Sequence, residues 1–284
     1  MNNVGVIGNG FVGNSIYHTF SPQFKVFVYD LNPVRSTHSL RDTIVNSDII
    51  FMCVPTPMKK DGTNDVGYVN TAFADILKLG IELKEKVFVL KSTVIPGTTD
   101  RLSLINAFNL VFSPEFLTER TAVADSICAN HVIIGSDTHE VAAKVAKLYK
   151  DRFGNAHKIF FTDAKTAEFI KYMRNCFFAT KVTYMNEMYK IAEIGGINWK
   201  DAVGGFALDG RIGHSHLDVP GHDGKFGYGG TCFPKDINAL IQYAFSLDED
   251  WEPGLLMAVD EMNLEYRGEE DWKKDVGRAV SEKK

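Results

Sequence analysis

The stretch from Phe226 to Asp236, FGYGGTCFPKD, carries residue types suited to covalent chemistry. Three glycines within four positions allow the backbone to come close to another backbone or to a ligand. Cys232 follows them, and Pro234 is well placed to begin a helix. A thiol directly before a helix meets unpaired N–H groups and the positive end of the helix dipole, which favour the thiolate. The stretch could therefore present an activated nucleophile, although a free cysteine is more often a small buried side chain.

The N-terminal segment carries the pattern of a dinucleotide-binding turn. An apolar run at 4–7 leads into Gly8, Gly10 and Gly13, a helix is expected over 14–20, and a second apolar run at 25–29 ends at Asp30. The glycines allow a tight turn, close approach of a pyrophosphate and tight packing of helix on strand. Asp30 would bind the ribose hydroxyls and repel a 2′-phosphate, so the pattern predicts NAD rather than NADP. Arg35 lies nearby and could pair with a 2′-phosphate, which keeps NADP as an alternative.

Five further apolar runs, at 48–54, 87–90, 110–112, 132–134 and 158–161, predict the remaining strands of a parallel sheet. Helix-like segments at 69–79 and 140–153 separate some of them, as in a sheet covered on both faces. Ligands of such sheets bind at the carboxyl ends of the strands. The residues after these runs are therefore candidates for a cleft, although Glu115 alone could equally be a solvated loop acid: Val54, Pro55, Thr56, Ser92, Thr93, Glu115 and Glu119.

After residue 162 the pattern changes to long helices. Lys171 and Asn175 are four residues apart and share one helix face, which is most often simply solvated. An amphipathic helix is predicted over 253–266, and a helix fraying into a charged tail from Glu269 onward. Six side chains near Lys171 recur at helical spacing and are predicted to face the core: Phe169, Tyr172, Met173, Cys176, Phe177 and Thr180.

The sequence thus predicts an α/β protein in which a Rossmann-like, doubly wound parallel sheet over residues 1–162 precedes an all-helical second domain over 163–284. The net charge of −5 and the absence of a Lys/Arg run argue against nucleic-acid binding. The four cysteines form no C-x-x-C pair, and His214 and His216 lack further ligands, so no metal site is expected. Without a signal peptide or an apolar run of membrane-spanning length, a cytoplasmic, soluble protein is predicted.

Taken together, the motifs resemble those of the UDP-glucose/GDP-mannose dehydrogenase family. The C-terminal motif is highly specific, whereas the glycine turn alone is not. The resemblance implies an NAD-dependent, four-electron oxidation of a nucleotide sugar's C6 alcohol to the carboxylate, as from UDP-glucose to UDP-glucuronate. The matching segments follow the family's order and cover nearly the whole chain: GNGFVG at 8–13, VPTP at 54–57, KSTV at 91–94, PEFL at 114–117, KYMRN at 171–175, RIG at 211–213 and GGTCFPKD at 229–236.

The resemblance also implies catalytic roles. Cys232 matches a nucleophile that forms a thiohemiacetal and then a thioester. Lys171 and Asn175 match residues near the reacting oxygen, where a cation and an amide donor stabilise oxyanions. Asp236 matches an aspartate that acts in proton transfer with Lys171 or a water, although an acid in a first helical turn is favourable in itself.

Further matches concern hydrolysis and binding. Glu115 matches the carboxylate that activates water to cleave the thioester, and Thr93 matches the residue that holds this water. Arg211 matches an arginine that, in family dimers joined through the central helix, reaches the sugar nucleotide of the partner subunit. The implied cofactor contacts are Gly8, Gly10, Phe11, Val12, Gly13, Asp30, Arg35, Val54, Pro55, Thr56, Ser92, Thr93, Glu119 and Lys235. The implied substrate contacts are Glu115, Phe116, Leu117, Lys171, Asn175, Arg211, Tyr228, Gly229 and Cys232.

The sequence departs from the family in two respects. The loop between Arg211 and Cys232 carries extra polar residues at 218–224, and the family's third, UDP-gripping domain would begin where this sequence ends, so weaker binding, a smaller substrate or a separately encoded partner is expected. Two other functions stay open. A two-electron β-hydroxyacid dehydrogenase would share the sheet and the Lys–Asn pair without needing Cys232, and a non-catalytic NAD-binding subunit would need none of the catalytic side chains.

Overall fold

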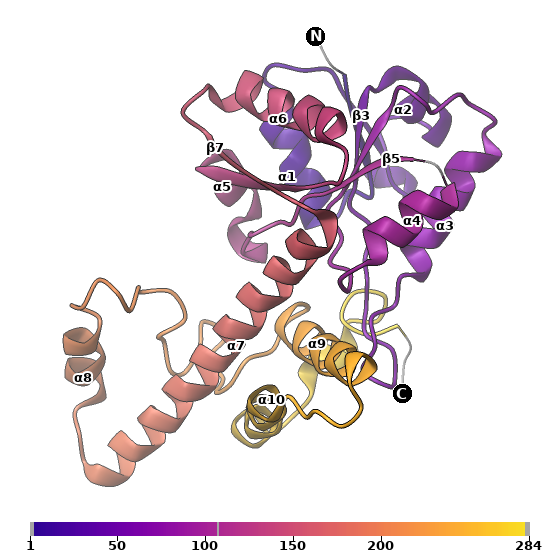
Figure 1. Ribbon diagram of the computed structural model, residues 1–284. Coiled ribbons are helices and arrows are strands. Elements are labelled where there is room, and N and C mark those ends of the chain that lie inside the picture. Colours follow the sequence, from indigo (N-terminus) through magenta and orange to yellow (C-terminus); the bar gives the residue numbers. More distant parts are fainter. Residues whose placement is uncertain (1–2, 107, 282–284) are drawn as a thin grey trace. The chain divides into compact units, whose positions relative to one another are not determined.

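Seven strands form one sheet in the computed structural model, which describes residues 3–106 and 108–281 (Figure 1). The order across the sheet is β2-β1-β3-β4-β5-β6-β7. Each strand coincides with one of the predicted apolar runs: β1 (Val4–Ile7), β2 (Val26–Tyr29), β3 (Ile49–Met52), β4 (Val87–Leu90), β5 (Asn109–Phe112), β6 (His131–Gly135) and β7 (Lys158–Thr162).

The sheet is mostly parallel. Strands β1 to β5 are parallel as predicted, whereas β6 pairs antiparallel with β5 through Phe112 and Gly135, and β7 is parallel to β6. The last two strands therefore run against the first five. Apolar runs report that a strand is buried, not in which direction it runs, so the sequence contained no sign of this reversal.

Both faces of the central strands are buried. Ile49 and Phe51 of β3 pack in a core with α1 (Phe11–Phe20) and α6 (His139–Phe153). Ile50 and Met52 of the same strand point the other way and pack with α2 (Leu40–Asn46), α3 (Gly67–Lys78) and α4 (Thr98–Asn106). Shorter elements complete this part of the chain: η1 (Pro33–Arg35), η2 (Glu119–Thr121) and α5 (Ala122–Ile127). The alternation of side chains along each strand thus produces a doubly wound sheet.

The chain forms two compact units. The first comprises Met1–Thr56 and Asp65–Lys171, and the second comprises Pro57–Asn64 and Tyr172–Lys284. The helix α7 (Ala164–Gly195) begins in the first unit and supplies the longest element of the second. The second unit also contains α8 (Trp199–Phe206), α9 (Phe233–Leu247), α10 (Gly254–Arg267) and η3 (Asp271–Lys274). No helix within the described residues is both long enough and apolar enough to cross a membrane.

Only part of the predicted core face of α7 is buried. Tyr172 and Cys176 are buried, but Phe169, Met173 and Phe177 are 44%, 53% and 62% exposed, so the prediction was wrong for these three. Neighbouring residues on a helix point about 100° apart, so Tyr172 and Met173 cannot share one face. The apolar positions of α7 form two adjacent stripes, and periodicity alone did not separate them.

The predicted fraying after Glu269 was also wrong. Trp272 is buried and packs with Ala279, Val280 and Met58. The Met58 N–H donates to the Ala279 carbonyl at 2.9 Å, and the Ser281 N–H donates to the Met58 carbonyl at 2.9 Å. The segment therefore forms a small, ordered cluster within the second unit, because its few apolar residues find a partner in Pro57–Asn64, about two hundred residues earlier in the chain.

Candidate active site

The glycine turn between β1 and α1 has the geometry that a pyrophosphate requires. Gly8 has φ +88°, and a side chain there would lie 2.8 Å from the Cys53 carbonyl oxygen at the end of β3. A side chain at Gly13 would collide with the Gly8 carbonyl, whereas Gly10 has open space around it at the start of α1. The turn lies where β1 separates β2 from β3, the switch point of the strand order. Phe11 and Val12 form the first turn of α1.

Asp30 follows β2 beside this turn. Its Oδ2 accepts the Asn9 N–H at 2.6 Å and its Oδ1 accepts the Asn32 N–H at 2.8 Å. A carboxylate has about four acceptor sites, so capacity remains for ribose hydroxyls. Arg35 is exposed, and its carbonyl accepts the Asn9 amide at 2.7 Å. The open space around Gly10 and the fixed Asp30 carboxylate together fit the adenosine half of NAD.

Hydrogen bonds from side-chain hydroxyls join the segments that follow β3 and β4. Thr56 Oγ1 donates to the Thr93 carbonyl at 2.7 Å, and Ser92 Oγ donates to the Val54 carbonyl at 2.6 Å. Thr56, Ser92 and Thr93 are all buried. The structure thus brings the predicted residues after these two strands together, including Pro55 between Val54 and Thr56. Glu119 is exposed at the start of η2.

Glu115, three residues after β5, forms a buried ion pair. Lys171 Nζ donates to Glu115 Oε1 at 2.7 Å and to the Glu115 carbonyl at 2.7 Å, and the Leu117 N–H donates to Oε2 at 2.7 Å. The side chains of Lys171 and Glu115 are 2% and 7% exposed. Burial opposes ionisation, but the Lys171 ammonium and the Leu117 N–H hold the pKa of Glu115 below its ordinary value. Phe116 lies beside the pair, its ring centroid 6.0 Å from Lys171 Nζ.

Lys91, the first residue of the KSTV motif at 91–94, is a buried cation with no role predicted from the sequence. Its Nζ donates to the Pro114 carbonyl at 3.0 Å and to Ser113 Oγ at 3.4 Å, directly before Glu115. Burial lowers the pKa of Lys91 from 10.5 to about 8. The available signal was a lysine at the carboxyl end of an otherwise apolar strand, a position where charge is rarely buried without a partner.

The second group of predicted residues lies around the start of α9. Cys232 is the N-cap of this helix and is half-buried, and its carbonyl accepts the Asp236 N–H at 3.0 Å. Asn175 Nδ2 donates to Asp236 Oδ2 at 2.6 Å, and Lys235 pairs with the other oxygen of Asp236. Asp236 and Asn175 are 1% and 2% exposed. A thiol at a helix N-terminus and a fixed carboxylate one turn later are the parts of a nucleophilic site.

Two other predicted substrate contacts, Tyr228 and Gly229, precede Cys232 in the glycine loop. Arg211 lies on an exposed turn, where it pairs with Asp209, and Lys181 of α7 holds this turn through the Ile212 and Gly213 carbonyls at 3.0 and 2.9 Å. The predicted catalytic residues thus form two groups. Thr93, Glu115 and Lys171 belong to the first unit, and Asn175, Cys232 and Asp236 belong to the second.

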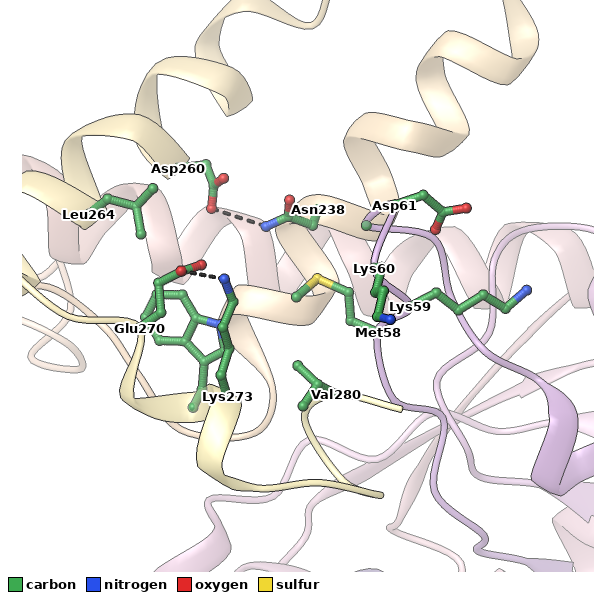
Figure 2. Close-up of a pocket in the computed structure, with 12 residues that line it drawn as sticks. Met58, Lys59, Lys60, Asp61, Asn238, Asp260, Leu264, Glu270, Lys273 and Val280 are labelled. Atoms are coloured by element: carbon green, nitrogen blue, oxygen red, sulfur yellow. Dashed lines mark hydrogen bonds and ion pairs between the residues drawn. The ribbon is translucent and has the colours of Figure 1, made fainter. Parts of the chain in front are cut away.

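A cavity of about 400 Å³ lies elsewhere in the second unit (Figure 2). Its walls come from the segment after Pro57, from α9 and α10, and from the C-terminal cluster. Asn238 donates to Asp260 at 3.1 Å on its surface, and Glu270 pairs with Lys273. None of the predicted site residues lines it. Within the described parts of the chain, no three His, Cys, Asp or Glu residues are grouped so as to hold a metal ion.

Comparison with known proteins relates both units to one family. Residues 32–152 match the NAD binding domain of the UDP-glucose/GDP-mannose dehydrogenase family, and residues 165–265 match its central domain. The UDP-glucose 6-dehydrogenase TuaD of Bacillus subtilis is 36% identical over 240 residues, which make up 81% of this chain and 49% of that protein. The chain thus spans about half the length of the curated relatives it matches.

Solved structures agree on the fold. A UDP-glucose dehydrogenase from Pyrobaculum islandicum superposes with a TM-score of 0.79 at 27% identity, covering 94% of this chain and 68% of that one. The 3-hydroxyisobutyrate dehydrogenase of Mycobacterium tuberculosis superposes with a TM-score of 0.73, covering 95% of both chains, but at 16% identity. The second likeness is one of fold alone.

Proposed function

Because the chain belongs to the UDP-glucose/GDP-mannose dehydrogenase family, we propose that it oxidises the C6 alcohol of a nucleotide sugar to the carboxylate through a covalent intermediate on Cys232. The observation that carries this proposal is the position of Cys232 as N-cap of α9, one helical turn before the buried Asp236–Asn175 pair. A two-electron dehydrogenase has no use for such a thiol. UDP-glucose is the proposed substrate, NAD the proposed cofactor and the cytoplasm the proposed compartment.

The first oxidation needs a proton acceptor. Asp236, directly or through a water, takes the C6 hydroxyl proton as the C6 hydride departs, which leaves an aldehyde. Bound NAD would accept a hydride in each of the two oxidations. Lys171 and Asn175 supply an ammonium and an amide N–H that stabilise negative charge on the sugar oxygen.

The second oxidation needs the thiolate. Cys232 Sγ bonds to the aldehyde carbon and the oxygen takes up a proton, giving a thiohemiacetal. Loss of that proton and of the second hydride gives a thioester. Glu115 then takes a proton from water, the resulting hydroxide attacks the thioester carbon, and the C–S bond breaks to release the acid and restore the thiolate. The balance is one alcohol, one water and two NAD converted to one carboxylate, two NADH and three protons.

The stoichiometry tests this proposal. We expect two NADH per UDP-glucose consumed in the wild type and no acid product in Cys232→Ala. Cys128→Ser is the matched control and should retain the ratio of two, because Cys128 is exposed at the C-terminal end of α5. A ratio of one in the wild type would instead establish a two-electron dehydrogenase. Binding of NAD without turnover of UDP-glucose, UDP-N-acetyl sugars or GDP-mannose would establish a non-catalytic subunit.

We further propose that the chain forms a homodimer through α7, so that Arg211 reaches the sugar nucleotide of the partner subunit. The exposed apolar stripe of α7 supports this proposal, since solvent-facing apolar side chains at helical spacing are typical of an interface. Its members within the second unit are between 49% and 78% exposed: Met173, Phe177, Tyr184, Ile191 and Ile194.

A further inference from the structure

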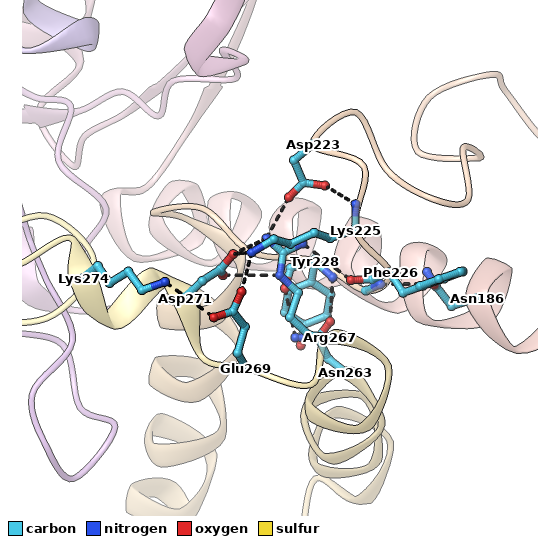
Figure 3. Close-up of polar contacts among 11 residues, drawn as sticks. Asn186, Asp223, Lys225, Phe226, Tyr228, Asn263, Arg267, Glu269, Asp271 and Lys274 are labelled. Atoms are coloured by element: carbon cyan, nitrogen blue, oxygen red, sulfur yellow. Dashed lines mark hydrogen bonds and ion pairs between the residues drawn. The ribbon is translucent and has the colours of Figure 1, made fainter.

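The glycine loop before Cys232 is held by an asparagine of α10 (Figure 3). Asn263 Oδ1 accepts the Tyr228 N–H at 2.6 Å, and Asn263 Nδ2 donates to the Tyr228 carbonyl at 3.0 Å. The side chain is fully buried. It thus binds both backbone groups of a single loop residue, as a neighbouring strand would.

A second asparagine holds the preceding residue. Asn186 of α7 accepts the Gly227 N–H on Oδ1 at 3.0 Å and donates from Nδ2 to the Val182 carbonyl at 2.8 Å in its own helix. Asn186 is 3% exposed. Successive loop residues are therefore fixed from two helices of the second unit, and the buried backbone groups find partners that the loop itself does not provide.

The loop glycines are required by this close contact. Gly227 has φ +64°, and a side chain there would lie 2.5 Å from Asn263 Oδ1. A side chain at Gly229 would collide with the guanidinium of Arg267. Arg267 is itself fixed, because it donates to Asp223 and Asp271 at 2.7 Å each, with its side chain only 3% exposed (Figure 3). Glycine is thus needed here for proximity to α10 as well as for backbone freedom.

We infer that Asn263 is a positioning residue for Cys232: it fixes the loop so that the thiol is presented at the N-terminus of α9. Tyr228 lies four residues before Cys232, so its two bonds to Asn263 limit where the thiol can be. A nucleophile displaced by about 1 Å from its carbonyl carbon loses on the order of a hundredfold in rate. The inference rests on the proposed function, in which Cys232 is the nucleophile.

Only an amide satisfies both bonds. An aspartate at 263 would place a second acceptor against the Tyr228 carbonyl, and an alanine would leave both backbone groups without their partner. We therefore expect Asn263→Asp and Asn263→Ala to share one defect. The first oxidation, which needs no thiol, continues, while addition of the aldehyde to Cys232 slows.

The kinetic test measures how the aldehyde is partitioned. In Asn263→Ala and Asn263→Asp we expect NADH per sugar to fall from two towards one, hydroxylamine to trap free aldehyde, and KM for the sugar to change less than about threefold. Val259→Ala, a buried apolar truncation one turn earlier on α10, is the matched control for lost stability. It should retain the ratio of two.

A second measurement needs no turnover. Alkylation of Cys232 by iodoacetamide at pH 7 is measured by mass spectrometry, with exposed Cys128 as internal reference. It should slow by about threefold or more in the Asn263 variants, because a loosened thiol moves away from the positive end of the α9 dipole, which favours the thiolate. If the wild type turns over no nucleotide sugar, the proposed function fails, and this alkylation ratio alone decides the role of Asn263.

Gly227→Ala tests the same contact from the loop side should the Asn263 variants not fold. We expect it to slow alkylation of Cys232 as well, and the double substitution Gly227→Ala/Asn263→Ala to be less than additive. The inference is overturned if Cys232 alkylation and the NADH ratio in the folded Asn263 and Gly227 variants equal those of Val259→Ala.

Discussion

Three polar groups hold Glu115 in place, two by direct contact and one through the preceding residue. Lys171 and the Leu117 N–H contact its carboxylate directly, whereas Lys91 fixes the carbonyl of Pro114 just before it. Lys91, Lys171 and Glu115 are all buried. Two ammonium groups and one carboxylate leave these three side chains with one excess positive charge. Such an excess is unfavourable for folding, but it suits a place where an oxyanion forms.

We predict that Lys91→Met slows hydrolysis of the thioester by ten- to a hundredfold, because Pro114 and then Glu115 shift when the ammonium is lost. The measurement is the fraction of Cys232 carrying an acyl adduct in rapidly quenched samples, read by mass spectrometry. Lys86→Met is the matched control, because Lys86 lies at the opposite end of β4 from Lys91. Its ammonium donates to the Val45 and Ser47 carbonyls. An adduct level equal in both variants would contradict a role for Lys91.

The pH dependence follows from the same lysine. Burial lowers the pKa of Lys91 to about 8, while an unfolded chain would keep the proton up to 10.5. In the folded wild type we therefore expect thioester hydrolysis to decline as the pH rises through about 8, since the ammonium is lost there. The free energy of unfolding should move the opposite way and rise between about 8 and 10.5, because the unfolded state then binds more protons. A hydrolysis rate unchanged from pH 7 to 9 would count against this role.

Among the elements, α4 depends on a carboxylate from another helix. Glu168 of α7 is fully buried and accepts the Gly97 N–H at 2.5 Å, the Thr99 N–H at 2.8 Å and the Thr99 hydroxyl at 2.6 Å. It thus satisfies donors at the start of α4 that the helix cannot satisfy itself. Burial nevertheless raises the pKa of Glu168 from 4.5 to about 7.

This shift predicts the sign of a stability change. Between pH 4.5 and about 7 the folded state keeps a proton that the unfolded state has lost, so the free energy of unfolding falls as the pH rises through this window. We expect the wild type to lose about 2 to 3 kcal/mol more than Glu168→Gln between these pH values, measured by urea unfolding. Asp163→Asn is the control, because Thr166 holds the pKa of Asp163 below 3.8 and its titration lies outside the window. Parallel curves for wild type and Glu168→Gln would refute the prediction.

The sequence identified the strands because each is a short apolar run, and β1, β3 and β4 are buried along their whole length. It identified the start of α9 to within one residue because Pro234 lies two residues after Cys232. It did not identify what holds the loop before Cys232. Asn263 contacts Tyr228 across 35 residues of chain, and its partners are backbone groups that leave no trace in side-chain spacing. Lys91 and Asn186 escaped assignment for the same reason. Long-range contacts between a side chain and the backbone depend on tertiary packing, which periodicity does not report.

A single copy of the chain leaves the apolar stripe on α7 exposed. We predict that Phe177→Asp weakens the proposed dimer by roughly thirtyfold or more, because a charge would be desolvated in the centre of the interface. Sedimentation equilibrium across a range of concentrations gives the dissociation constant.

Leu104→Asp is the matched control, since Leu104 is 86% exposed on α4 of the first unit. It should leave the dimer intact. A wild type that is monomeric at every concentration would refute the dimer, and an unchanged constant in Phe177→Asp would place the interface elsewhere.

Met58 and Ala279 impose an order on the folding of this chain during synthesis. The chain passes between the two units after Thr56, after Asn64 and after Lys171, so the second unit is assembled from an early and a late piece. A ribosome would release Met58 long before its hydrogen-bonding partners Ala279 and Ser281. Strands β3 and β4, which precede and follow residues 57–64 in the chain, could assemble early, but the second unit must wait for Ala279 and Ser281. For the same reason, a fragment that begins at Tyr172 would lack Met58, and circular permutation that joins 57–64 to the second unit would be needed to produce that unit alone.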